Sequence, residues 1–99
     1  MSLRIEVDRQ SIARFCRRNG IRRLSFFGSV LHDDFGPDSD VDVLVEFEPD
    51  AAVGLFEFVD LQQEMSELVG RDVDLRTPAS LSHFFRDEVV SSAEVAYAA

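Results

Sequence analysis

Gly28-Ser29-Val30-Leu31-His32-Asp33-Asp34-Phe35-Gly36-Pro37-Asp38-Ser39-Asp40-Val41-Asp42 is the stretch that decides the fold. A Gly-Ser pair closes one apolar run, and two aspartates open a second run that continues as Val43-Leu44-Val45. If Val41 to Phe47 is a strand, Asp40 and Asp42 point to the same face of it. Their Cα atoms then lie about 6.5–7 Å apart, because a strand rises about 3.3 Å per residue. Carboxylates at that separation can bind two metal ions roughly 3.5–4 Å apart, so the spacing predicts phosphoryl or nucleotidyl transfer.

Helix and strand signals alternate on both sides of this stretch. Asp8 is a predicted cap for a helix from Arg9 to Asn19, which Gly20 ends, and a strand follows from about Ile21 to Phe27. Ser29 is then expected at the start of a short helix, where its hydroxyl and the free backbone N–H groups can bind phosphate. A simple helix cap is the structural alternative for Ser29, and both roles can hold together.

The second half of the chain continues the alternation. Apolar residues recur at helical spacing and are expected to face the core, namely Leu55, Phe58, Val59, Gln62, Met65, Leu68 and Val69, with Phe56 beside them. Gly70 ends this helix, Val73 to Leu75 form a short strand, and a final helical region runs from Thr77 towards Tyr97. Strands separated by helices predict an α/β fold, a small mixed β-sheet with packed helices, in one domain over residues 1–99.

Three aspartates are candidates for a metal site because they lie in or beside apolar strands. An unpaired carboxylate is costly to remove from water at Asp42 or Asp74, and three converging carboxylates repel one another unless a cation binds between them. Ordinary turn and strand-end roles explain Asp40 alone but not all three. A calcium loop is excluded, since its motif requires Gly and Glu where this chain has Val43 and Pro49.

The same motif resembles the signature of the minimal nucleotidyltransferases, which are the short single-domain members of the DNA polymerase β superfamily. The matching segments cover nearly the whole chain: Leu24–Ser29, Pro37–Phe47, Arg71–Leu75 and Phe84–Val89, together with Tyr97. The resemblance implies a polymerase β-like nucleotidyltransferase fold. His32 stands where many relatives carry an arginine, and a missing guanidinium weakens the expected contact with phosphate.

The resemblance also implies a role for each site residue. Asp40 and Asp42 would hold two Mg²⁺ ions on the triphosphate of ATP, and Gly28 and Ser29 would hold its β- and γ-phosphates. Asp74 would complete the shell of the second ion and help to deprotonate the attacking hydroxyl. These five residues are therefore the expected catalytic, metal-binding and nucleotide-binding groups.

Many minimal nucleotidyltransferases similar to this chain are antitoxins that pair with a HEPN-class RNase toxin. The implied function is transfer of AMP from ATP to a tyrosine of that toxin. The alternative is a non-catalytic antitoxin that neutralises its toxin by binding alone, which the small size, the acidity and His32 favour. The residues leave open the base preference of the nucleotide, the modified residue and the stoichiometry of a complex.

Composition restricts the partners of the chain. Its 99 residues carry a net charge of -9, and seven of its ten arginines lie before residue 31. An acidic chain is a poor binder of nucleic acid but suits a basic protein partner, which the acidic stretch from Asp33 onward is expected to attract. Asp33, Asp34 and Asp72 are expected to face solvent. No membrane span or signal peptide is expected, and the single Cys16 predicts a small buried side chain in a reducing cytoplasm.

Overall fold

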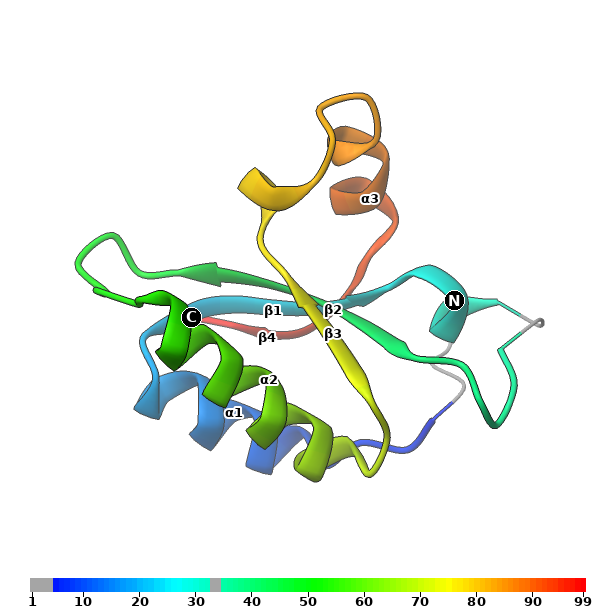
Figure 1. The fold of residues 1–99 in the computed structure, drawn as a ribbon, viewed down its shortest axis with the longest axis horizontal. Helices are drawn as coiled ribbons and strands as arrows, with labels where there is room; N and C mark the ends of the chain where they lie inside the picture. The colour runs from blue at the N-terminus through cyan, green and yellow to red at the C-terminus, as the bar shows by residue number, and fades with distance from the viewer. Residues whose placement is uncertain (1–4, 33–34) are drawn as a thin grey trace.

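A four-stranded mixed sheet forms the centre of the protein (Figure 1). The computed structural model describes residues 5–32 and 35–99, so Asp33 and Asp34 lie outside the described residues. The strand order is β3-β2-β1-β4, with β2 and β3 parallel and the other pairs antiparallel. The strands are β1 (Ile21–Phe27), β2 (Val41–Phe47), β3 (Val73–Arg76) and β4 (Glu94–Ala98). The helices are α1 (Arg9–Arg18), α2 (Leu55–Val69) and α3 (Arg86–Ser92), with 3₁₀ turns η1 (Gly28–Leu31) and η2 (Pro78–Ser80).

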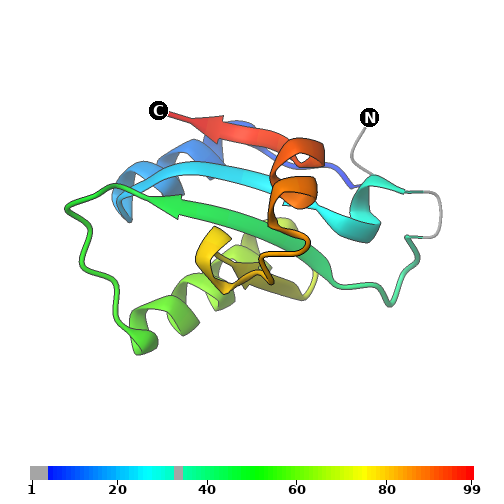
Figure 2. The same cartoon turned by 90° about the horizontal axis from the view of Figure 1, so that it is seen from above.

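The helices cover the two faces of the sheet unequally. Figure 1 shows α1 and α2 together on one face, while η2 and α3 lie on the opposite side. The core lies under α1 and α2, and its fully enclosed side chains come from both helices, from η1 and from the strands: Ile12, Phe15, Cys16, Ile21, Leu24, Phe26, Val30, Val41, Val43, Val45 and Met65. The view from above in Figure 2 shows η2 and α3 in front of only part of the sheet. This second face is therefore the more open one.

Local sequence signals explain where the first two helices begin and end. The Asp8 carboxylate accepts hydrogen bonds from the backbone N–H groups of Gln10 and Ser11, at 3.0 and 3.4 Å, and so caps α1. Gly70 ends α2 in the left-handed conformation, with φ of 73°. The predicted positions of both helices and of the first three strands are confirmed.

The end of the chain differs from the prediction. A continuous helical region towards Tyr97 was expected, but α3 ends at Ser92 and β4 follows it. Tyr97 lies opposite Leu24 on β1, and without β4 the hydrogen-bonding groups on that side of β1 would be an unpaired edge. Pairing with a distant strand therefore outweighs the weak local preference of a five-residue segment.

The expected apolar face of α2 is only partly buried. Leu61 and Met65 reach the core, whereas Leu55, Phe56 and Val59 are 76%, 83% and 53% exposed. Figure 2 shows the start of α2 diverging from the strands, where Phe58 packs against the core beside Phe47, with ring centroids 6.4 Å apart, and its neighbours do not. The prediction that this stripe is core is confirmed for Phe58, Met65 and Val69, and it is wrong for the exposed Leu55, Phe56, Val59 and Leu68.

Candidate active site

Asp42 and Asp74 lie side by side on the more open face of the sheet. They are direct partners in the parallel pairing of β2 and β3, where neighbouring strands lie about 4.8 Å apart. Val41 and Val43, on either side of Asp42, are fully buried under the helices, so Asp42 points to the opposite face as the sequence predicts. The sheet thus brings together two of the three predicted carboxylates.

Gly28 completes this part of the site from the end of β1. Its φ of +76° is in the left-handed region, which favours glycine. A Cβ at this position would lie 2.3 Å from Oδ2 of Asp42, so only a residue without a side chain allows this close approach. Ser29 follows in the first turn of η1, whose end is closed by a 2.9 Å hydrogen bond from the His32 N–H to the Ser29 carbonyl. Gly28 therefore lies directly against the Asp42 carboxylate, and Ser29 is the next residue along the chain.

Asp74 is held by an arginine that the sequence analysis did not single out. Arg76 Nε donates to Asp74 Oδ1 at 3.1 Å, and the terminal Nη2 donates to Oδ2 at 3.0 Å. The two side chains share a face because they are two residues apart on β3. That spacing is the one sequence signal for the pair.

The electrostatics of Asp42 favour a bound cation. Burial raises the pKa of Asp42, and the carboxylates of Asp74 and Asp40 raise it further, while Arg76 acts in the opposite direction. Within residues 5–32 and 35–99, no hydrogen bond reaches the Asp42 carboxylate. A partly desolvated carboxylate without a donor is a suitable ligand for a hard divalent cation such as Mg²⁺.

The described residues nevertheless contain no group of three acidic, histidine or cysteine side chains arranged to hold a metal ion. Asp40 is exposed at the start of β2, and Asp74 is turned into its ion pair with Arg76. The donor chemistry fits Mg²⁺, but an ion that binds Asp74 must compete with the guanidinium of Arg76 for its oxygens.

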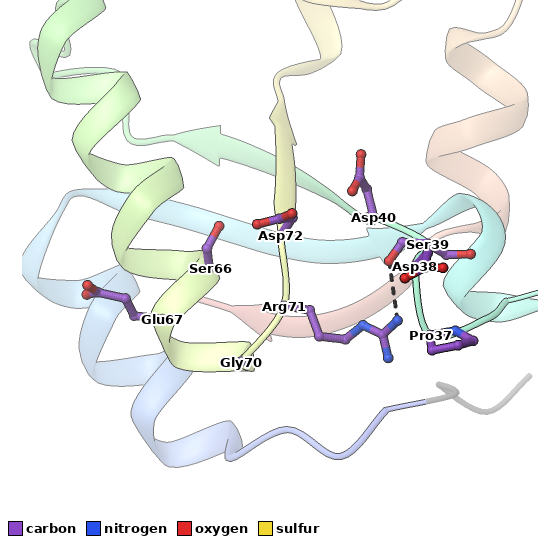
Figure 3. Close-up of a pocket in the computed structure, with 9 residues that line it drawn as sticks. All are labelled: Pro37, Asp38, Ser39, Asp40, Ser66, Glu67, Gly70, Arg71 and Asp72. Atoms are coloured by element: carbon purple, nitrogen blue, oxygen red, sulfur yellow. Dashed lines mark hydrogen bonds between the residues drawn. The ribbon is translucent and has the colours of Figure 1, made fainter.

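Arg71 fixes the loop that leads into Asp40. Its Nη2 donates to the carbonyl oxygens of Gly36, at 2.6 Å, and Ser39, at 3.4 Å. Its guanidinium carbon lies 4.4 Å from the ring centroid of Phe35, in a cation–π contact. Figure 3 shows the side chain reaching across to this loop. No short-range sequence pattern could reveal this contact, because the partners are 32 to 36 residues away.

The cavity in Figure 3 has a volume of about 600 Å³ and opens beside this loop. Asp40 lines it, together with Asp38, Asp72 and Arg71, but Gly28, Ser29, Asp42 and Asp74 do not. The predicted site is therefore an open surface on the sheet, and the cavity adjoins it only at Asp40.

A family comparison agrees with this geometry. The sequence matches the nucleotidyltransferase domain family over residues 9–96. The chain belongs to this family. The match includes every residue of the candidate site, so a nucleotidyltransferase scaffold positions the Gly-Ser pair and the three aspartates.

Two relatives of this nucleotidyltransferase carry more specific descriptions. A candidate protein adenylyltransferase of Methanocaldococcus jannaschii is 33% identical over 76 residues, which are 77% of this chain and 80% of the relative. The protein adenylyltransferase MntA of Thermococcus cleftensis is 39% identical over 64 residues, which are 65% of this chain and 63% of the relative. Both relatives are described as enzymes that attach AMP to proteins.

Solved structures share the same fold. A candidate minimal nucleotidyltransferase is 32% identical and superposes with a TM-score of 0.71, over 86% of this chain and 85% of the other. A toxin–antitoxin structure with AMP-PNP gives 0.74 at 21% identity, over 94% and 75% of the two chains. A tri-AMPylated Shewanella oneidensis HEPN toxin in complex with an MNT antitoxin gives 0.66 at 22% identity, over 92% and 70%. The predicted polymerase β-like nucleotidyltransferase fold is confirmed.

The remaining sequence predictions concern the periphery of the nucleotidyltransferase site. His32 is exposed just after η1. Asp72 is exposed before β3, as expected. Cys16 is fully buried, and burial raises the pKa of its thiol to about 12. The helices α1, α2 and α3 all fall short of the length and apolar character of a membrane span, so the described part of the chain contains none.

Proposed function

We propose that this nucleotidyltransferase is an antitoxin that transfers AMP from ATP to a tyrosine of a HEPN-class RNase toxin, and that it depends on Mg²⁺. The observation that carries the proposal is the close approach of Gly28 to the Asp42 carboxylate, with Asp74 on the neighbouring strand. A surface of this kind lets a phosphate chain approach the backbone next to carboxylates that bind its counter-ions. The protein adenylyltransferases among the relatives support the same reaction.

Each predicted residue has a role in this reaction. Asp40 and Asp42 would hold two Mg²⁺ ions, which when bound neutralise the triphosphate, and Gly28 and Ser29 would bind its β- and γ-phosphates. Asp74 would contribute to the second ion's shell and accept the proton of the attacking hydroxyl. The hydroxyl oxygen then bonds to the α-phosphorus as the bond to pyrophosphate breaks in line, which conserves charge and atoms.

The structure also gives a specific reason to keep the rival function. Asp74 is occupied by Arg76, and the described residues show no three-ligand metal cluster. A chain in which Arg76 permanently holds Asp74 would neutralise its toxin by binding alone.

The location of the protein in a reducing cytoplasm, expected from its one cysteine, stays a prediction.

One experiment separates the two functions. The chain is incubated with the product of the adjacent gene, Mg²⁺ and radiolabelled ATP, and the intact mass of the partner is measured. Wild type should add one or more AMP units, and EDTA should prevent the addition. The double variant Asp40→Ala/Asp42→Ala should bind the partner without changing its mass.

The RNase activity of the partner is then measured after the two proteins have been separated. It should remain low after treatment with wild type and return after treatment with the double variant. If both chains neutralise the partner equally and neither changes its mass, the enzymatic proposal fails and the binding-only function replaces it. Peptide mapping of the modified partner would show whether the acceptor is a tyrosine.

A further inference from the structure

Large apolar side chains project into solvent around α3, on the side of the sheet that carries Asp42 and Asp74. Phe84 is 80% exposed, Phe85 59% and Val90 40%. The His83 ring lies against Phe84, with centroids 4.2 Å apart, so the two rings form one exposed aromatic pair. Exposed apolar groups at this density on a small domain indicate an interaction surface. We call Phe84, Phe85, Val90 and the adjoining Asp87 and Glu88 the α3 surface.

The charge of the α3 surface indicates the chemistry of its partner. Asp87 and Glu88 are exposed in the first turn of α3. The neighbouring Arg86 turns inward, where Nε donates to the Pro78 carbonyl at 2.7 Å and Nη2 to the Leu81 carbonyl at 3.2 Å. The charged groups that solvent meets on this surface are therefore predominantly acidic. Nucleic acid or an anionic membrane would be repelled, whereas a basic protein surface would be attracted.

The α3 surface lies on the same side of the sheet as the candidate site, and this position indicates that its partner is the protein that accepts AMP. A hydroxyl that receives AMP must come within roughly 3–3.5 Å of the α-phosphorus in the reactive geometry. Figure 1 shows η2 directly beyond the end of β3 and α3 on the same side of the sheet, which is its open face. A protein that contacts α3 therefore approaches the face on which its acceptor must arrive.

The start of α2 provides an internal comparison. Leu55 and Phe56 are at least as exposed, at 76% and 83%, and no basic residue lies between positions 48 and 70. However, α2 covers the opposite face of the sheet (Figure 1). A partner that docked there would have the sheet between itself and the carboxylates. The two surfaces are similarly exposed, but only the α3 surface lies on the side of the sheet that carries Asp42 and Asp74.

We propose that the α3 surface docks the protein that accepts AMP, through a basic patch on that protein with apolar side chains that pack against Phe84, Phe85 and Val90. This inference rests on the proposed function for the identity of the acceptor, a HEPN-class toxin. The contact would place the acceptor hydroxyl over the carboxylate face and would supply part of the affinity of the complex.

Paired variants test this surface against its comparison. Phe84→Gln/Phe85→Gln removes the aromatic part of the α3 surface, and Asp87→Lys/Glu88→Lys reverses its charge while leaving the apolar groups unchanged. Leu55→Gln/Phe56→Gln is the matched control on α2. The Kd for the toxin is measured by calorimetry at low and high salt, and binding of AMP-PNP with Mg²⁺ is measured without the toxin.

Both α3 variants should weaken toxin binding on the order of tenfold or more, and the charge reversal should also diminish the salt dependence. The α2 control should stay within about twofold of wild type, and all variants should bind AMP-PNP like wild type. If the α3 variants bind the toxin as wild type does, or if the α2 control loses affinity instead, the inference is overturned while AMP transfer by wild type can still stand. If wild type binds the toxin without transferring AMP, the enzymatic proposal fails and the docking surface is still decided by the Kd values. If wild type binds no toxin, both fail.

Discussion

Gly28→Ala tests the contact on which the proposed site depends. The substitution adds a Cβ where φ is +76°, which costs about 1–2 kcal/mol for a residue with a side chain. It also places that Cβ 2.3 Å from Asp42 Oδ2, so the carboxylate must turn away from the Gly-Ser pair. Because Asp42 is half-buried and can adopt another rotamer, the additional cost to stability is about 0.5–1.5 kcal/mol. The main loss is therefore expected in ligand binding.

Gly70→Ala is the matched control. Gly70 has nearly the same φ, 73°, but a Cβ there would meet no atom within 4 Å. Both variants should lower the Tm by roughly 4–8 °C for each kcal/mol lost, as expected for a domain of this size. The difference in Tm between the two variants measures the effect of the contact with Asp42, because the backbone strain is common to both.

Thermal unfolding is measured with and without Mg²⁺ and AMP-PNP, alongside AMP transfer. Gly70→Ala should keep the stabilisation by both ligands and the transfer, while Gly28→Ala should lose most of each. The reasoning would be refuted if Gly28→Ala kept the ligand-dependent rise in Tm, because the close approach would then be irrelevant to the site. Equal losses in the two variants would instead assign the effect to backbone strain.

Three further predictions follow from the same contacts. The pKa of Asp42 is raised in the folded protein, so the folded state loses stability as pH rises from about 3.9, the usual pKa of an aspartate, through the raised pKa. Asp42→Asn should remove this loss and be more stable than wild type at pH 7 without metal. A series of Tm measurements over pH would test this. Arg76→Gln should free Asp74 and strengthen binding of Mn²⁺ to the nucleotide-free protein, measured by calorimetry; weaker or unchanged binding would mean that the ion pair does not compete with the metal. Arg71→Ala should leave the carbonyls of Gly36 and Ser39 without their donor and cost about 1–3 kcal/mol in denaturant unfolding, with a partial recovery in Arg71→Lys; a cost near zero would show that the loop holds its shape without this side chain.

Local patterns were sufficient to predict most of the framework. The cap at Asp8 and the stop at Gly70 depend on backbone groups within a few residues, so they can be found without the fold. The side on which Asp42 lies follows from the two-residue period of a strand, with Val41 and Val43 fixed in the core. The sequence predicted that Asp42 and Asp74 converge, whereas their direct pairing on parallel neighbouring strands is known only from the structure.

Features that depend on distant partners could not be predicted. β4 exists because it pairs with β1 across about 70 residues, and its own five residues carry little local preference. The exposure of Leu55 and Phe56 depends on where α2 leaves the sheet, which helical spacing does not reveal. The spacing identified an apolar face correctly but could not tell a core-facing residue from one that faces solvent or a partner.

Arg76 compensates part of the negative charge of the candidate site. Asp42 and Asp74 face each other across neighbouring strands, an arrangement that would be unfavourable if both charges were uncompensated. Arg76 compensates Asp74 with two hydrogen bonds, and it also opposes the rise in the pKa of Asp42. The negative charge of Asp42 is not compensated in this way, because its carboxylate receives no hydrogen bond within the described residues. If the proposed function is correct, the carboxylates of Asp42 and the neighbouring Asp40 are available to bind a divalent cation. The cation would have to compete with Arg76 for Asp74. The ion pair with Arg76 thus weakens Asp74 as a metal ligand without excluding it, because each carboxylate oxygen keeps a second lone pair.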